Sequence, residues 1–107
     1  MTLLRTLTLA GYLFGAMGIA AAVAAAGTVV SQKGKAFSEK EMTLAIGDSI
    51  TFKNEDDVKH NILIKKMDYN SGVQEPGNET TVTFDTAGKF KVRCGIHPKM
   101  KMKVVVN

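Results

Sequence analysis

The stretch from residue 6 to residue 32 contains no charged residue, and this limits the fold more than any other feature. It follows a single cation, Arg5, and becomes rich in alanine toward residues 24–26. This order is typical of a secretory signal peptide, so we expect residues 1–26 to be removed; an uncleaved membrane anchor is the alternative. Either way, the remaining 81 of 107 residues form an exported, periplasmic domain at residues 27–107.

The size and charge of this exported part exclude several classes of protein. Residues 27–107 carry 13 Lys and Arg against 10 Asp and Glu, a net charge of +3. A chain this short forms one domain and is too small for a multidomain enzyme. Because its positive charge is mild, we expect no nucleic-acid partner.

After residue 27, hydrophobic side chains alternate with polar ones and show no helical period. The alternation predicts short strands at residues 27–32, 41–46, 49–53, 60–65, 79–84, 88–94 and 101–106. The polar segment 66–78 is predicted to be a loop, and Ile46 is expected to face inward with Met42 and Leu44. Strands of this length and spacing predict an all-β Greek-key β-sandwich.

Cys94 is the only cysteine, so no disulfide within the chain can stabilise this small domain. Small exported domains commonly depend on disulfides or on a metal. The segment from Cys94 through His97 to Met100 places a thiol, an imidazole and a thioether at three-residue intervals. His60 begins an earlier predicted strand, and two loops of a sandwich can meet at one pole. We therefore expect His60 to lie beside this segment.

Two imidazoles, one thiolate and one thioether form a ligand set suited to copper in both oxidation states. Structural zinc has no use for a thioether, and haem attachment needs a second cysteine. A Cys/His nucleophile pair would also need an orienting group and a pocket, so we predict no catalytic residues and no enzymatic activity. Singly, each residue has an ordinary structural explanation; together, His60, Cys94, His97 and Met100 predict a copper site.

Two methionines compete for the place of the thioether ligand. Met102 shares the strand face of Val104 and Val106, so we expect it in the hydrophobic core. Met100 precedes that strand and can reach back from the turn. The pattern therefore favours Met100.

The segments around these residues resemble the cupredoxins, the small blue copper proteins, and in particular the plastocyanin and amicyanin group. Residues 52–54 and 60–62 are similar to the strand, turn and first-ligand stretch of plastocyanins, and residues 88–94 to the strand that leads into the cysteine. The spacing C-x2-H-x2-M at residues 94–100 resembles the short ligand loop of amicyanins. The similarity covers nearly all of residues 27–107.

The resemblance implies an eight-stranded sandwich that holds one type 1 copper ion cycling between Cu(II) and Cu(I). It implies that His60, Cys94 and His97 are equatorial ligands and Met100 the axial ligand. Asn61 would join the two ligand loops by hydrogen bonding, an interaction that maintains ligand geometry.

The resemblance also implies that electrons pass through the exposed edge of His97. Ile96 and Pro98 would provide apolar surface around this edge for partner docking, and Lys59 and Lys99 lie near the same pole. If these lysines steer an acidic partner, association slows as the salt concentration rises.

These expectations describe a small, monomeric, periplasmic blue copper protein that carries one electron between redox proteins, such as a c-type cytochrome or a periplasmic dehydrogenase. A membrane contact is expected only if residues 1–26 are retained. Two other classes stay open. One is a periplasmic copper chaperone or store without a redox circuit, although Met42 and Met67 form no Met-rich tract. The other is a metal-free sandwich used in adhesion or assembly.

Overall fold

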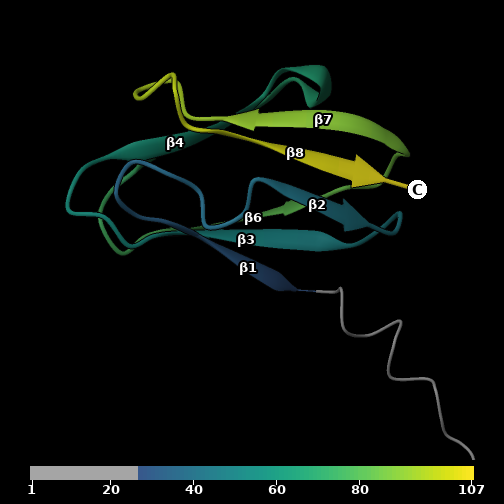
Figure 1. Ribbon diagram of the computed structural model, residues 1–107, viewed down its shortest axis with the longest axis horizontal. Coiled ribbons are helices and arrows are strands. Elements are labelled where there is room, and N and C mark those ends of the chain that lie inside the picture. The colour runs from purple at the N-terminus through teal and green to yellow at the C-terminus, as the bar shows by residue number, and fades with distance from the viewer. Residues whose placement is uncertain (1–26) are drawn as a thin grey trace, which may run out of the picture.

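The computed structural model describes residues 27–107, which form two β-sheets packed into a sandwich (Figure 1). The predicted signal peptide or anchor, residues 1–26, lies outside the described residues. One sheet has the order β1-β3-β6 and consists of Thr28–Gln32 (β1), Ser49–Asn54 (β3) and Glu79–Thr83 (β6). The other has the order β2-β8-β7-β4-β5 and consists of Glu41–Leu44 (β2), His60–Ile64 (β4), Tyr69–Gln74 (β5), Gly88–Arg93 (β7) and Lys101–Val106 (β8).

Neighbouring strands in both sheets are often far apart in the sequence. β3 pairs with β6 antiparallel, whereas β1 with β3 and β2 with β8 are parallel pairs. The predicted all-β Greek-key sandwich is confirmed. Within residues 27–107 the only helical segment is a 3-10 turn at Lys65–Met67 (η2), and no helix there is long and apolar enough to cross a membrane.

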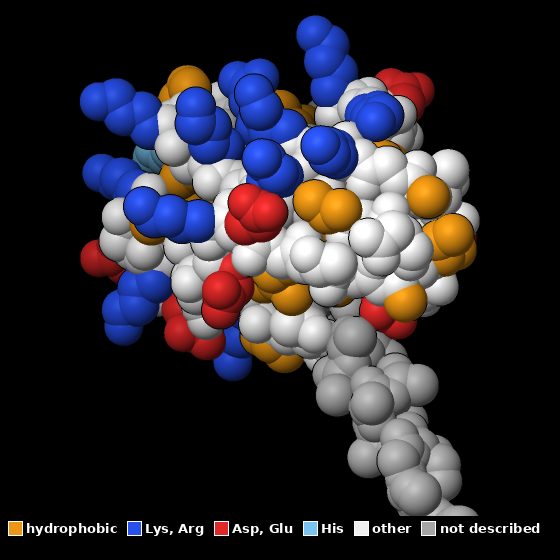
Figure 2. Space-filling view, turned by 45° about the vertical axis from the view of Figure 1, so that its right-hand side comes forward, with side chains coloured by type: hydrophobic (Ala, Val, Ile, Leu, Met, Phe, Trp, Pro, Cys, Tyr) orange, Lys and Arg blue, Asp and Glu red, His pale blue; other side chains and the backbone are white. Residues whose placement is uncertain are grey.

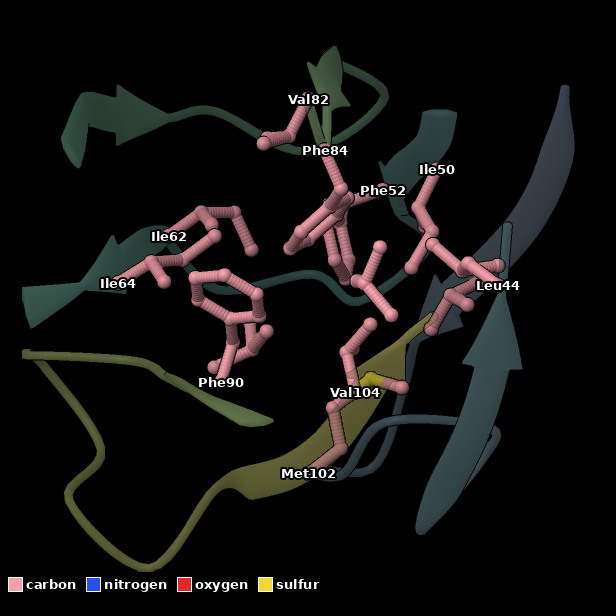
Figure 3. Packing of buried hydrophobic residues seen from close by; sticks show 13 residues of the cluster. Leu44, Ile50, Phe52, Ile62, Ile64, Val82, Phe84, Phe90, Met102 and Val104 are labelled. Atoms are coloured by element: carbon pink, nitrogen blue, oxygen red, sulfur yellow. The ribbon is translucent and has the colours of Figure 1, made fainter. Parts of the chain in front are cut away.

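The core lies between the two sheets and follows from the alternation along each strand. On β7, Phe90 and Val92 are buried while their neighbours are exposed; on β8, Met102, Val104 and Val106 are buried, as predicted. Figure 3 shows side chains of the two sheets meeting in the middle of the sandwich. Burial of each large apolar side chain contributes about 1.5–3 kcal/mol to folding.

Two predictions about local structure are wrong. Residues 69–74, predicted to be part of a loop, form β5, the edge strand beside β4. An edge strand is held by backbone hydrogen bonds on one side and carries mostly polar side chains, so it lacks the alternation that identifies a half-buried strand. Ile46 is 56% exposed, because β2 ends at Leu44 and a turn follows.

The pairing of β4 with β7 determines where the candidate site lies. The two strands are antiparallel, with Leu63 opposite Arg93, so the start of β4 lies near the end of β7. In Figure 1 the β3–β4 connection and the β7–β8 turn occupy the same end of the sandwich, at the left. His60 opens β4 and Cys94 directly follows β7, so this topology brings both to one pole.

Candidate metal centre

The structure brings His60 and Cys94 into contact although they are 34 positions apart. Nδ1 of His60 lies 3.7 Å from Sγ of Cys94, and both side chains are fully buried. Cys94 is a free thiol, as its being the only cysteine requires. The first two predicted ligands therefore present a ring nitrogen and a sulfur to each other.

His97 lies in the turn after β7 and packs its ring against His60. The two ring centroids are 4.9 Å apart and the ring planes meet at 70°. Nε2 of His97 is buried and has no hydrogen-bond partner in the part of the chain that the structure describes. A buried polar atom left without a partner costs about 1–3 kcal/mol. A metal ion bound by this nitrogen would remove that cost.

Met100 closes the same turn through its backbone. Its N–H donates to the carbonyl of His97 at 2.9 Å, and its carbonyl accepts from the N–H of Cys94 at 3.1 Å. Its side chain is buried but does not belong to the main hydrophobic core, whereas Met102 packs within that core. This difference supports Met100 as the thioether donor.

The four predicted donors do not form a closed coordination shell. Within residues 27–107, no three His, Cys, Asp or Glu side chains are grouped so that they could hold a metal ion on their own. The structure places His60 and Cys94 in contact, sets the His97 ring edge-to-face with His60 and buries Met100 in the connecting turn. The buried, unpartnered nitrogen and the soft sulfur donors fit copper. The assignment of the four side chains as ligands stays a prediction.

Asp56 is a site residue that the sequence reasoning missed. Its carboxylate lies 2.8 Å from Nε2 of His60 and accepts hydrogen bonds from the backbone N–H groups of Gly34 and Lys35 at 3.0 and 2.9 Å. The Lys35 bond, followed by the one to His60, lowers the pKa of Asp56 from 3.8 to about 2. The carboxylate is therefore ionised at neutral pH.

The ionised carboxylate also determines which nitrogen of His60 carries the proton. A carboxylate can only accept hydrogen bonds, so the hydrogen of neutral His60 is on Nε2, and Nδ1 presents its lone pair toward Cys94. Metal-bound histidines commonly make such a bond through the second nitrogen, and it maintains ring orientation and ligand basicity. Asp56 thus leaves the lone pair of Nδ1 available on the side of His60 that faces Cys94.

Hydrogen bonds of the buried Asn54 side chain fix the turn that carries Asp56. Oδ1 of Asn54 accepts from the N–H of Asp56 at 2.9 Å, and Nδ2 donates to the carbonyls of Val58 and Gln74 at 2.9 and 3.1 Å. Asn-x-Asp at a strand end, with a histidine four residues after the Asp, is the local signal that was overlooked. Asn side chains commonly form turns of this kind.

Asn61 joins the two segments that carry the candidate ligands. Its Oδ1 accepts from the N–H of Gly95 at 2.6 Å, which links β4 to the turn after β7. A Cβ at Gly95 would lie 2.7 Å from Cδ1 of Leu63, so a side chain there would require the Leu63 side chain to move. The ligand turn is therefore held close to β4 by a hydrogen bond and by the absence of a side chain.

The residues predicted for partner docking lie in the two connections at this pole. Ile96 is 43% exposed, and Pro98 and Lys99 are exposed next to it in the ligand turn. Lys59 lies in the β3–β4 connection and forms an ion pair with Glu75 at 3.8 Å, with both side chains exposed. Such surface pairs contribute little to stability, so Lys59 is partly neutralised but not immobilised.

Residues 6–106 match the family of cupredoxin-like domains, and the chain belongs to that family. The chain is 33% identical over 110 residues to chloroplastic plastocyanin from Silene latifolia subsp. alba, which covers 86% of this chain and 67% of that protein. It is 38% identical over 66 residues to methylamine utilization protein MauL from Methylophilus methylotrophus, which covers 57% of this chain. That match spans only 38% of the length of MauL.

Solved structures show the same fold. The reduced Cu(I) form of an amicyanin variant at pH 4 superposes with a TM-score of 0.71 at 24% identity, covering 76% of this chain and 82% of that one. An oxidised amicyanin variant gives the same TM-score, identity and coverage. Together with the family match, this likeness confirms the predicted cupredoxin fold. Copper is the metal that the family and the donor chemistry indicate.

Proposed function

We propose that this chain is a small electron-transfer protein that holds one copper ion through His60, Cys94, His97 and Met100. The observation that carries the proposal is the contact of the buried Cys94 thiol with Nδ1 of His60, beside the unpartnered Nε2 of His97. When bound, copper would supply a reversible one-electron couple between Cu(II) and Cu(I). The relatives named plastocyanin and amicyanin support this class over an enzyme.

The protein's own part in this function is to keep the donors in nearly the same place in both oxidation states. His60 sits on a strand with a neighbour on each side, and Asp56 holds its far ring nitrogen. Cys94 and Met100 are joined by a backbone hydrogen bond across the turn, and Asn61 attaches that turn to β4. A site held from several sides rearranges little when its charge changes, which favours fast electron transfer.

Burial indicates the route by which an electron would enter and leave. His60, Cys94 and Met100 are buried, whereas His97 is half-buried and lies between exposed Ile96 and Pro98. The His97 ring is therefore the donor nearest to a docked protein. We propose donor and acceptor proteins in the periplasm, for example a c-type cytochrome or a dehydrogenase, that contact this pole briefly as a one-to-one complex.

The test is to add Cu(II) to the purified protein and record its visible spectrum and its voltammetric response, in parallel with Cys94→Ser. We expect an intense blue form with a reversible couple, and loss of the blue colour without the thiolate. Met102→Leu is the matched control, since it alters a core methionine near the turn and should keep the colour. A colourless protein that takes up only Cu(I) would instead favour a copper chaperone or store.

A further inference from the structure

A hollow of about 670 Å³ is lined by the loop before β2, at residues 35–40, by residues 89–91 of β7 and by residues 99–103, which lead into β8. More than half of the residues that line this hollow are lysines, and most of the others are apolar. The lysines are Lys35, Lys40, Lys89, Lys91, Lys99, Lys101 and Lys103. Exposed Ala36 and half-buried Phe37 also line the hollow, and almost fully buried Phe90, Met100 and Met102 lie behind it. We call this feature the lysine hollow.

The lysine hollow separates the charge of the domain into two parts. Seven of its lining residues are lysines and only Glu39 is acidic, a local charge of +6. The rest of residues 27–107 carries six cations against nine carboxylates, a charge of −3. Figure 2 shows Lys and Arg side chains gathered toward the upper left of that view, with few carboxylates among them. In the described chain the ion pairs are Lys59–Glu75 and His60–Asp56, so none of the seven lysines is paired.

Strand register makes this concentration of charge unfavourable for the isolated domain. Lys91 on β7 lies directly opposite Lys103 on β8, and Arg93 lies opposite Lys101. Like charges at directly opposed positions destabilise a sheet. Glu41 on β2 faces Lys103 from the other side, but without an ion pair. These positions point away from the core, so the fold does not require cations there. The lysines therefore indicate a surface whose charge is neutralised by a bound partner.

We infer that the lysine hollow is a docking surface for an acidic protein, one that presents Asp and Glu side chains around an apolar residue. The cations extend along two strands and an adjoining loop, so a single small anion would meet only a few of them, whereas an acidic surface can meet most. Ala36 and the accessible part of Phe37 offer apolar contact for one hydrophobic side chain. Electrostatic complementarity of this kind raises the rate of association and selects partners.

The position of Met100 connects this surface to the candidate metal centre. Its side chain is a predicted copper ligand, and the same residue lines the lysine hollow. A protein docked there therefore lies close to the candidate metal centre and next to the Ile96 and Pro98 edge, because Lys99 follows Pro98 and also lines the hollow. A role for this docking in electron transfer rests on the proposed function. Docking of an acidic protein to the lysine hollow does not depend on that function.

The test uses the metal-free, 15N-labelled protein and a synthetic peptide of glutamates around a central leucine. We expect saturable amide shifts confined to residues 35–40, 89–91 and 99–103, which weaken as the ionic strength rises and the Debye length falls from about 30 Å to about 8 Å. Lys91→Gln with Lys103→Gln should weaken binding roughly tenfold. The control, Lys53→Gln with Lys65→Gln, removes the same charge outside the hollow and should change binding less than about twofold.

A second readout separates docking from a structural role for these lysines. Because the substitutions in the hollow relieve like-charge repulsion, that variant should have a higher urea midpoint than the wild type while it binds the peptide less well. Equal loss of binding in the control, or shifts spread over the whole surface, would overturn the proposal. So would inorganic phosphate that reproduces the shifts and displaces the peptide, since the hollow would then be a small-anion site. None of these outcomes depends on copper, so each is distinct from failure of the electron-transfer proposal.

Discussion

The two regions that supply the candidate ligands differ in how completely the protein itself satisfies them. At the start of β4, His60 is fully buried and each ring nitrogen has a neighbour, Asp56 on one side and Cys94 on the other. In the turn after β7, His97 is half-buried and its Nε2 has no partner among the described residues. The protein itself therefore provides neighbours for both ring nitrogens of His60, whereas Nε2 of His97 would find a partner only in a bound group. In the proposed function, β4 would position the metal and the turn would contact the partners.

The largest expected difference between the two regions is in the free energy of unfolding of two alanine variants. In the metal-free protein, His60→Ala removes a fully buried ring and one of the three hydrogen bonds that Asp56 accepts, so we expect a loss of about 2–4 kcal/mol in the free energy of unfolding. His97→Ala removes an unsatisfied nitrogen from a turn and should change stability by less than about 1 kcal/mol. Urea unfolding of both variants checks this, and equal losses would show that the two regions are equally arranged by the fold.

The next effect concerns the attachment of the turn to β4. Gly95→Ala places a Cβ 2.7 Å from Cδ1 of Leu63, so we expect a loss of about 1–2 kcal/mol in stability, because the Leu63 side chain must shift and the Asn61 hydrogen bond is strained. Leu63→Ala removes the clashing methyl group. The double variant should therefore lose less than the two single losses combined, and strictly additive losses would contradict the contact.

Asp56→Asn tests the support behind His60. An amide cannot accept from His60, Gly34 and Lys35 together as the carboxylate does, so we expect Cu(II) affinity to fall about tenfold. Asp57→Asn is the control, because it makes the same change at an exposed neighbour and should leave affinity unchanged. Competition with a chelator measures affinity. The 15N shifts of the His60 ring in metal-free protein should also show a mixture of tautomers in Asp56→Asn only.

The smallest effect is an acid dependence. The folded-state pKa of Asp56 is about 2, below its ordinary value of 3.8, so the carboxylate contributes stability that is fully present above pH 3.8. This contribution is lost as the pH falls toward 2. The difference in unfolding free energy between wild type and Asp56→Asn, measured without metal, should therefore shrink across this window. A difference that stays constant from pH 5 to pH 2 would rule out this linkage.

Much of this fold could be predicted because the informative patterns are local. Alternation with a period of two identifies a strand that buries one face, and this holds for β7 and β8, where lysines alternate with Phe90, Val92, Met102 and Val104. β5 was missed because an edge strand is specified by its neighbour's backbone more than by its own side chains. The spacing from Cys94 to Met100 is also local, so three of the candidate ligands could be read from one turn.

The supports of the site depend on contacts between distant segments. Gln32 donates to Gln74 at 2.8 Å across 42 positions, and Gln74 in turn accepts from Asn54 through its backbone carbonyl, in a buried network beneath His60. A sequence pattern cannot predict the hydrogen-bond partners of a buried glutamine, because tertiary packing determines which groups lie next to it. The same is true of the loop N–H groups of Gly34 and Lys35 that hold Asp56.

By itself, the sequence of this protein determined the β class, most strand positions and the soft donor set, since each depends on residue type and short spacing. The sequence also predicted that His60 lies beside the segment that begins at Cys94, and tertiary structure supplied the 3.7 Å contact. Tertiary structure alone decided that Asp56 orients His60 and that lysines of two strands and a loop surround one hollow. The physical reason is that strand register and loop packing set distances between residues that are remote along the chain. Strand register and loop packing both depend on several segments, so no single segment encodes them.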